Sequence, residues 1–241
     1  MYFSEVVIPV VDLRADPTAE PLMVRGHDRR RHTQLLAGQC VHVLGSSNGW
    51  CDVEVPEQMI GHAQGIPRPY RGFVPEEALR HQNHCSCRSS HVSPWSADTG
   101  NCLCQKARSY LTQPYLWGGL SCHNPLCQQP QTGPDCSGLV WLAYQEIGLL
   151  IPRNAADQCA IGRRAAFSEL RLGDLVFTAP SGGNVNHVLI YAGPTVIEAT
   201  ARDGAVVREI LPEKRFGFPF SSCMDGDNIN DTQFFFRGYL S

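Results

Sequence analysis

The segment Asp135-Cys136-Ser137-Gly138 runs directly into an apolar stretch, residues 139–144. This pattern predicts a helix over residues 135–147 that ends at Gly148. Cys136 would lie in its first turn, where unpaired backbone N–H groups and the positive end of the helix dipole favour the thiolate over the thiol. The thiolate is the reactive form of cysteine, so the segment predicts a nucleophile at a helix start.

A base for such a nucleophile lies about fifty residues further along the chain. Asn186-His187 leads into residues 188–191, Val-Leu-Ile-Tyr, which predict a strand with an imidazole at its start. A cysteine followed by a histidine is a catalytic order. The alternatives are a buried structural thiol for Cys136 and a hydrogen-bonded strand-end imidazole for His187.

Length and charge narrow the class of protein. A chain of 241 residues with 43% hydrophobic composition can bury one large core or two modest ones, and we favour two domains. The net charge of −3 and the scattered Lys and Arg residues argue against a nucleic-acid partner, and we expect the short run 29–31 to be a solvated loop.

The apolar segments and the N-terminus bear on location. No apolar segment approaches the roughly 18 residues of a membrane span, so we expect a soluble protein without one. Residues 1–11 contain Glu5 and Pro9 but neither Lys nor Arg, which makes a poor signal peptide. We therefore favour the cytoplasm, with the periplasm or secretion by an unusual route as the alternative.

The first eighty residues predict a small all-β domain. Short β-branched runs over 5–13, 40–44, 50–55 and 72–74 predict strands, and residues 45–49 predict a turn. The region 1–80 resembles a bacterial SH3-like barrel, and some other small β domain is the alternative. The resemblance rests on Asp12-Leu13-Arg14, Leu35-Leu36-Ala37-Gly38, Val41-His42-Val43-Leu44, Gly49-Trp50 and Tyr70-Arg71-Gly72-Phe73-Val74-Pro75.

Residues 81–105 are rich in Ser, His and Cys without helical or strand periodicity, which predicts a linker. The pairs Cys85/Cys87 and Cys102/Cys104, near His81, His84 and His91, raise the possibility of a metal site. One intervening residue fits zinc poorly, because structural zinc sites usually place two to four residues between paired cysteines. The same argument applies to Cys122 with Cys127, so we expect no metal. Eleven cysteines are an odd number, and at least one thiol stays unpaired within the monomer.

The region 106–241 predicts an α+β domain. We expect a short helix over 106–111 that ends before Pro114, the helix over 135–147, and a helix over 154–165 with Asn154 as its cap. Strands are expected over 175–177, 187–192, 195–199 and 206–210, as an antiparallel sheet behind the helix that carries Cys136.

Five sequence blocks in this region resemble an NlpC/P60 cysteine peptidase. They are Pro114-Tyr115-Leu116-Trp117-Gly118-Gly119, Asp135-Cys136-Ser137-Gly138-Leu139-Val140, residues 151–158, Leu172-Gly173-Asp174-Leu175-Val176-Phe177, and Asn186-His187-Val188-Leu189-Ile190-Tyr191. The resemblance implies a papain-like domain in which Cys136 is the nucleophile and His187 the base, with no cofactor. It also implies hydrolysis of amide bonds in bacterial cell-wall peptides, commonly between γ-D-glutamate and the following diamino acid.

The third catalytic residue departs from the family pattern. Most members place a polar residue, typically histidine, on the next strand, and here one deletion in the turn 193–195 brings Glu198 to that position. A carboxylate can accept the second ring N–H of His187 and stabilise the imidazolium. A surface carboxylate is the alternative for Glu198, with Thr200 or Asn186 as substitutes. The resemblance also places the Tyr115 hydroxyl near the nucleophile, where it can assist the oxyanion site.

Substrate-binding residues follow from the same resemblance. Family members with an N-terminal SH3-like domain recognise the free α-amine of a stem peptide through residues that match Asp135 and Ser137, and we expect Trp117 to line the pocket. Asp135 as a helix cap and Trp117 as a core aromatic are the alternatives. The expected partners are peptidoglycan-derived peptides with a free N-terminal amine. A non-catalytic wall-binding protein and a thiol acyltransferase are the alternative functions.

Overall fold

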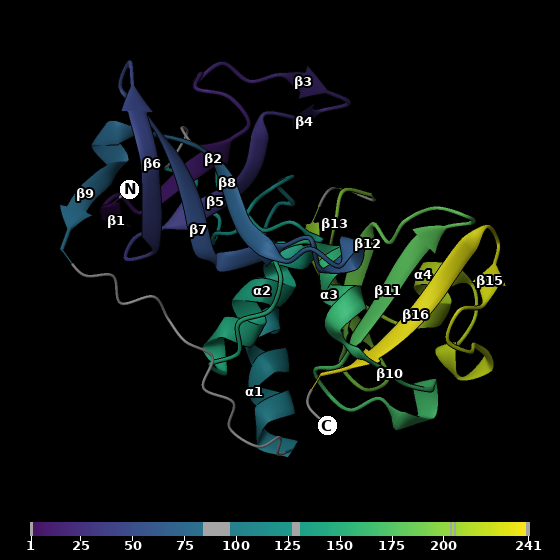
Figure 1. Cartoon of the computed structure of the whole chain (residues 1–241). Coiled ribbons are helices and arrows are strands. Elements are labelled where there is room, and N and C mark those ends of the chain that lie inside the picture. Colours follow the sequence, from purple (N-terminus) through teal and green to yellow (C-terminus); the bar gives the residue numbers. More distant parts are fainter. Residues whose placement is uncertain (1, 84–96, 127–130, 203, 205, 240–241) are drawn as a thin grey trace.

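The computed structural model describes residues 2–83, 97–126, 131–202, 204 and 206–239. These residues form a mixed α/β structure with two large antiparallel sheets and few helices. In Figure 1 the N-terminal sheet (purple to blue) and the C-terminal sheet (green to yellow) are separate, and the helices α2 and α3 lie between them in this view. The order of the elements therefore agrees with the prediction of an all-β region followed by a region of mixed helices and strands.

The N-terminal sheet has seven strands in the order β5-β2-β8-β7-β6-β1-β9. Alternating buried valines, such as Val41, Val43, Val53 and Val55, fill its core. The elements of this region are β1 (Tyr2–Val6), β2 (Val10–Arg14), the hairpin β3 (Met23–Val24) and β4 (His27–Asp28), β5 (Arg31–Leu36), β6 (Cys40–Ser47), β7 (Trp50–Ile60), η1 (His62–Gln64), β8 (Arg68–Pro75), η2 (Glu76–Ala78) and β9 (Leu79–Gln82).

Two details of this sheet differ from the sequence prediction. The strand expected over 5–13 is two strands, β1 and β2, because the chain bends between them at residues 7–9, which include Pro9. The expected turn over 45–49 contracts to Asn48-Gly49, whose φ angles of 51° and 76° give the two-residue hairpin that matches strand twist. Among the described residues no strand pair joins β5 to β9, so the predicted closed barrel is not shown.

The C-terminal sheet has the strand order β10-β16-β11-β12-β13-β14, with β15 paired to β16. Its strands are β10 (Arg163–Arg164), β11 (Leu175–Pro180), β12 (His187–Tyr191), β13 (Val196–Thr200), β14 (Val206–Ile210), β15 (Asn228–Ile229) and β16 (Thr232–Gly238). The helices are α1 (Ala97–Arg108), α2 (Cys136–Glu146), α3 (Ala155–Ile161), α4 (Pro212–Phe216), η3 (Phe167–Glu169) and η4 (Phe220–Ser222). One core joins α1 and α2 to residues such as Phe177 and Ile190, and a second core contains Phe220, Phe234 and Phe236.

The predicted linker and the predicted bounds of two helices need correction. The linker expected over 81–105 is wrong at both ends, since β9 extends to Gln82 and α1 begins at Ala97. Helix α1 ends at Arg108 rather than occupying 106–111, and α3 ends at Ile161 rather than at residue 165, because β10 pairs with β16 from Arg163 onward. Asn154 precedes α3 but makes no side-chain cap hydrogen bond. The rest of the expected linker, 84–96, lies outside the described residues.

Helix α2 is a core helix. Its residues 136–144 are all buried, and a helix that is apolar on every side has to be enclosed by other elements. Its first turn approaches Gly119 so closely that a Cβ on Gly138 would lie 2.2 Å from the Gly119 carbonyl oxygen. The glycine of the Asp-Cys-Ser-Gly segment therefore permits the contact that fixes the position of Cys136.

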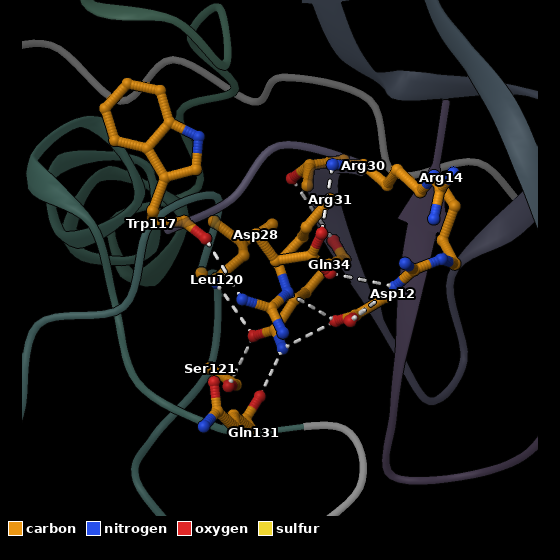
Figure 2. A network of polar contacts seen from close by, with 12 residues as sticks. Asp12, Arg14, Asp28, Arg30, Arg31, Gln34, Trp117, Leu120, Ser121 and Gln131 are labelled. Carbon is orange, nitrogen blue, oxygen red and sulfur yellow. Dashed lines mark hydrogen bonds and ion pairs between the residues drawn. The ribbon is translucent and has the colours of Figure 1, made fainter. Parts of the chain in front are cut away.

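Gln34 makes four hydrogen bonds, three of which link the N-terminal sheet to the segment 120–131 before α2 (Figure 2). Its side-chain oxygen accepts from the Leu120 backbone N–H (3.1 Å) and the Ser121 hydroxyl (2.8 Å). Its amide nitrogen donates to Asp12 (3.1 Å) and to the Gln131 carbonyl (2.6 Å). All four side-chain bonding positions of this fully buried residue are used, so the N-terminal sheet holds the segment that leads into α2.

Arg31 makes a second link of the same kind. Its guanidinium lies 2.9 Å from Asp12 and donates to the Trp117 carbonyl (3.3 Å).

Within the described parts of the chain, no helix is long and apolar enough to cross a membrane.

Candidate active site

Cys136 is the first residue of α2, as the sequence predicts. Asp135 caps the helix, since its carboxylate accepts a hydrogen bond from the Gly138 N–H at 2.6 Å. This cap leaves the amide of Cys136 at the open end of the helix, where backbone N–H groups lack partners within the helix. The sulfur therefore lies at a place suited to a developing negative charge.

His187 opens strand β12 and points toward Glu198 on the neighbouring strand β13. Its Nε2 lies 2.6 Å from Oε2 of Glu198. The imidazole also makes a hydrogen bond with Cys136, which leaves its Nδ1 for the sulfur. The structure thus brings Cys136, His187 and Glu198 into one line, and their catalytic roles stay predictions.

Burial and the two partners act on His187 in opposite directions. Burial alone lowers the pKa of an imidazole, but the hydrogen bonds and charges of Cys136 and Glu198 more than offset it and raise the pKa of His187 to about 9. Burial likewise raises the pKa of a carboxylic acid, yet His187 and the nearby arginines hold the pKa of Glu198 at about 2. The geometry therefore favours a protonated imidazole beside a charged carboxylate.

Two arginines that the sequence prediction missed contact the other oxygen of Glu198. Oε1 accepts from Nε of Arg208 at 3.0 Å and from Nε of Arg215 at 2.8 Å. Arg208 lies directly opposite Glu198 in the pairing of β13 with β14, and Arg215 belongs to α4. Strand alternation around Glu198 could have suggested Arg208, whereas nothing local in the sequence points to Arg215.

A cavity of about 440 Å³ opens onto Cys136 and His187 and also includes Tyr115 and Trp117 in its lining, whereas Glu198 is buried outside it. Burial raises the pKa of Tyr115, and the charges of Cys136 and Asp135 raise it further, so its hydroxyl stays a hydrogen-bond donor. Trp117 is 38% exposed and is stacked on His27, with Arg29 over its ring. The alternatives for the third residue, Asn186 and Thr200, also line this cavity.

Asp135 and Ser137, which were predicted to bind the substrate's free amine, are buried beside the cavity and already have hydrogen-bond partners within the chain. Both oxygens of Asp135 accept from Arg153, at 3.0 and 2.8 Å, and the Ser137 hydroxyl contacts the same two residues. The Arg153 side chain is 1% exposed and also donates to Thr33 of β5 and to the Gly119 carbonyl. Arg153 lies in the sequence block 151–158, and its contacts are those of a bridge between β5 and the cap of α2.

The cysteines discussed as metal ligands do not gather among the described residues. No group of three or more His, Cys, Asp or Glu with metal-binding geometry occurs there. Cys102 is exposed on α1, while burial raises the pKa of Cys104 to about 11. Cys85, Cys87, His84, His91 and Cys127 lie outside the residues described.

Comparisons with known proteins give a consistent result. Residues 112–215 match the model of the NlpC/P60 family. Over 122 residues the chain is 38% identical to peptidoglycan endopeptidase RipB of Mycobacterium tuberculosis, which covers 48% of this chain and 49% of RipB. Over 198 residues it is 34% identical to the gamma-D-glutamyl-L-lysine dipeptidyl-peptidase of Bacillus subtilis, covering 78% of this chain and 62% of that protein.

The chain thus spans about half to three fifths of the length of these relatives. Its fold matches the crystal structure of an NlpC/P60 family protein from Bacillus cereus ATCC 10987, with a TM-score of 0.72 and 19% identity. That match covers 99% of this chain and all of the other.

Proposed function

Since residues 112–215 form a domain of the NlpC/P60 family, we propose that this protein is a cysteine peptidase acting on peptidoglycan stem peptides. The single observation that carries the proposal is the line of Cys136, His187 and Glu198, in which Cys136 and His187 line one cavity and Glu198 is buried behind the imidazole. A thiol, an imidazole and a carboxylate in this order are the parts that nucleophilic amide hydrolysis requires.

Each residue has a definite role in the proposed reaction. The Cys136 thiolate attacks the amide carbonyl, the His187 imidazolium protonates the leaving amine, and water then hydrolyses the thioester with His187 as base. Glu198 fixes the imidazole orientation and stabilises its charge. The backbone N–H of Cys136 and the Tyr115 hydroxyl stabilise the oxyanion, which a protonated phenol can do.

We propose the bond between γ-D-glutamate and the following diamino acid as the one that is cut. The support is the relative from Bacillus subtilis named for γ-D-glutamyl-L-lysine, which aligns over 198 residues. We also propose that the N-terminal region is an SH3-like unit that restricts the substrate to peptides with a free N-terminal amine. Its hairpin β3–β4 supports this, because His27 packs on Trp117 and lines a second cavity of about 550 Å³ that shares Tyr115 and Trp117 with the first.

A digest of defined peptides tests this proposal. The full chain should release the diaminopimelate portion from L-Ala-γ-D-Glu-diaminopimelate. Mass spectrometry of the digest measures this release. Acetylation of the N-terminal amine should lower kcat/KM about 10- to 100-fold, since it removes a charge-assisted hydrogen bond.

Other outcomes of this digest would exclude parts of the proposal. Undiminished cleavage of the acetylated peptide would reject the amine requirement. Binding without release would favour the wall-binding alternative, and transfer of the acyl group to an added amine would favour the acyltransferase.

The pH dependence of cleavage follows from the two shifted groups. The imidazolium needed to protonate the leaving amine persists up to the raised pKa of His187, about 9, so the alkaline limb of kcat/KM should have its midpoint near pH 9. Glu198, with its pKa near 2, stays charged throughout and adds no limb above pH 4. An alkaline midpoint near the ordinary histidine value would contradict the proposed pairing of His187 with Cys136 and Glu198.

A further inference from the structure

Glu198 brings a full negative charge to a position that is completely buried. A buried carboxylate is costly unless charged or hydrogen-bonded partners compensate it, and without them it takes up a proton instead. His187 compensates part of this charge through Oε2, and further compensation comes through Oε1. That oxygen is shared by Arg208 and Arg215, at distances of 2.8 to 3.0 Å.

The two arginines approach from separate elements. Arg208 comes from the strand beside Glu198, and Arg215 comes from α4, which follows that strand. Each directs its Nε toward Oε1, and Arg208 adds Nη2 at 2.9 Å. Two planar donors on one oxygen restrict rotation of the carboxylate, which keeps the other oxygen directed at the imidazole.

The charges around the site define what the arginines can change. Glu198 faces His187, Arg208 and Arg215, and His187 in turn faces Cys136. Tyr115, Arg202 and Asp231 line the same cavity. With a thiolate and an imidazolium present, Cys136, His187, Glu198 and the two arginines together carry one net positive charge. That charge favours the thiolate.

We propose that Arg208 and Arg215 are positioning residues for catalysis, which pin one oxygen of Glu198 so that the other orients His187 toward the Cys136 sulfur. The proposal rests on the thiol chemistry of the proposed function, but its test needs no peptide substrate. Loss of either arginine frees the carboxylate and removes a positive charge. Both changes make the thiolate and imidazolium pair harder to form.

The test measures alkylation of Cys136 by iodoacetamide as a function of pH, with mass spectrometry of the peptide that contains Cys136. In the wild type the rate follows formation of the thiolate on the acid side. Arg208→Gln and Arg215→Gln should each raise the midpoint of this acid limb by roughly 1 pH unit, the size of shift that a nearby charge produces. Arg208→Lys and Arg215→Lys, which keep the charge but lose the planar fork, should shift it less in the same direction.

Two comparisons separate positioning from a purely structural role. In the Glu198→Gln background, Arg215→Gln should shift the midpoint much less, because no carboxylate remains to be held. Arg108→Gln, which breaks an ion pair with Glu209 on the same strand as Arg208, should leave the midpoint unchanged.

An equal shift in both backgrounds, or no shift in either single variant, would overturn the proposal. If the glutamine variants do not fold, the lysine variants decide: an unshifted midpoint overturns it. Failure of peptide cleavage with these shifts intact would reject the proposed substrate and leave the positioning role standing.

Discussion

Replacing Cys136 by alanine is expected to abolish peptide release, with kcat reduced on the order of 10⁶-fold, as is found when a catalytic nucleophile is removed. The sulfur forms the covalent bond with the substrate, and Cys136 is the only cysteine among the described residues that line the cavity. The measurement is release of the diaminopimelate portion from the defined peptide. Glu198→Ala should reduce release less, because an orienting group takes no part in the bond making.

Controls show whether the loss is chemical. Cys136→Ala should keep the thermal midpoint close to that of the wild type, since it removes one sulfur at the cavity edge. Cys102→Ala, at an exposed free cysteine on α1, should retain full activity. Turnover by Cys136→Ala at the wild-type rate would remove the proposed mechanism.

The largest expected loss of stability comes from Arg153→Met, which should lower the free energy of unfolding by about 3–5 kcal/mol. Arg153 is buried and pairs through two hydrogen bonds with Asp135, so the variant leaves a carboxylate in the interior without its cation. It also loses the bonds to Thr33 and the Gly119 carbonyl. Denaturant unfolding of the full chain, read by tryptophan fluorescence, measures the change.

Two further variants test this explanation. Arg153→Met combined with Asp135→Asn should recover part of the lost stability, because no uncompensated charge remains. Arg164→Met, at an exposed arginine whose partner Asp225 keeps Arg237, should change stability by less than about 1 kcal/mol. A loss of the same size in both single arginine variants would show that burial of the pair is not the cause.

The sequence predicted those features that depend on short-range chemistry. Asp135 caps α2 and Cys136 opens it, because helix starts are set by neighbouring residues. His187 begins a strand for a similarly local reason, since β-branched and apolar residues follow it. The family resemblance predicted that Glu198 would lie beside His187, and in the structure the two side chains are hydrogen-bonded.

The features that were missed depend on contacts between distant parts of the chain. Helix α1 contains Asp98, Thr99, Gly100 and Asn101, which are weak helix formers, so packing of Leu103, Cys104 and Ala107 against the core stabilises it instead. Strand β16 pairs with β11 across more than fifty residues, and its place between β10 and β11 has no local signal. The contacts of Arg215 and Arg153 likewise exist only after the chain has folded.

Gln34 has a consequence for how such proteins can diversify. Its amide completes the hydrogen bonding of a backbone group and a hydroxyl just upstream of α2. A gene fusion that exchanged the N-terminal sheet for an unrelated domain would leave those groups buried without a hydrogen-bond partner, unless the new domain supplied an equivalent amide. The two halves are therefore expected to be inherited together. Recombination between homologues should succeed only where Gln34 and its hydrogen-bond partners are transferred together.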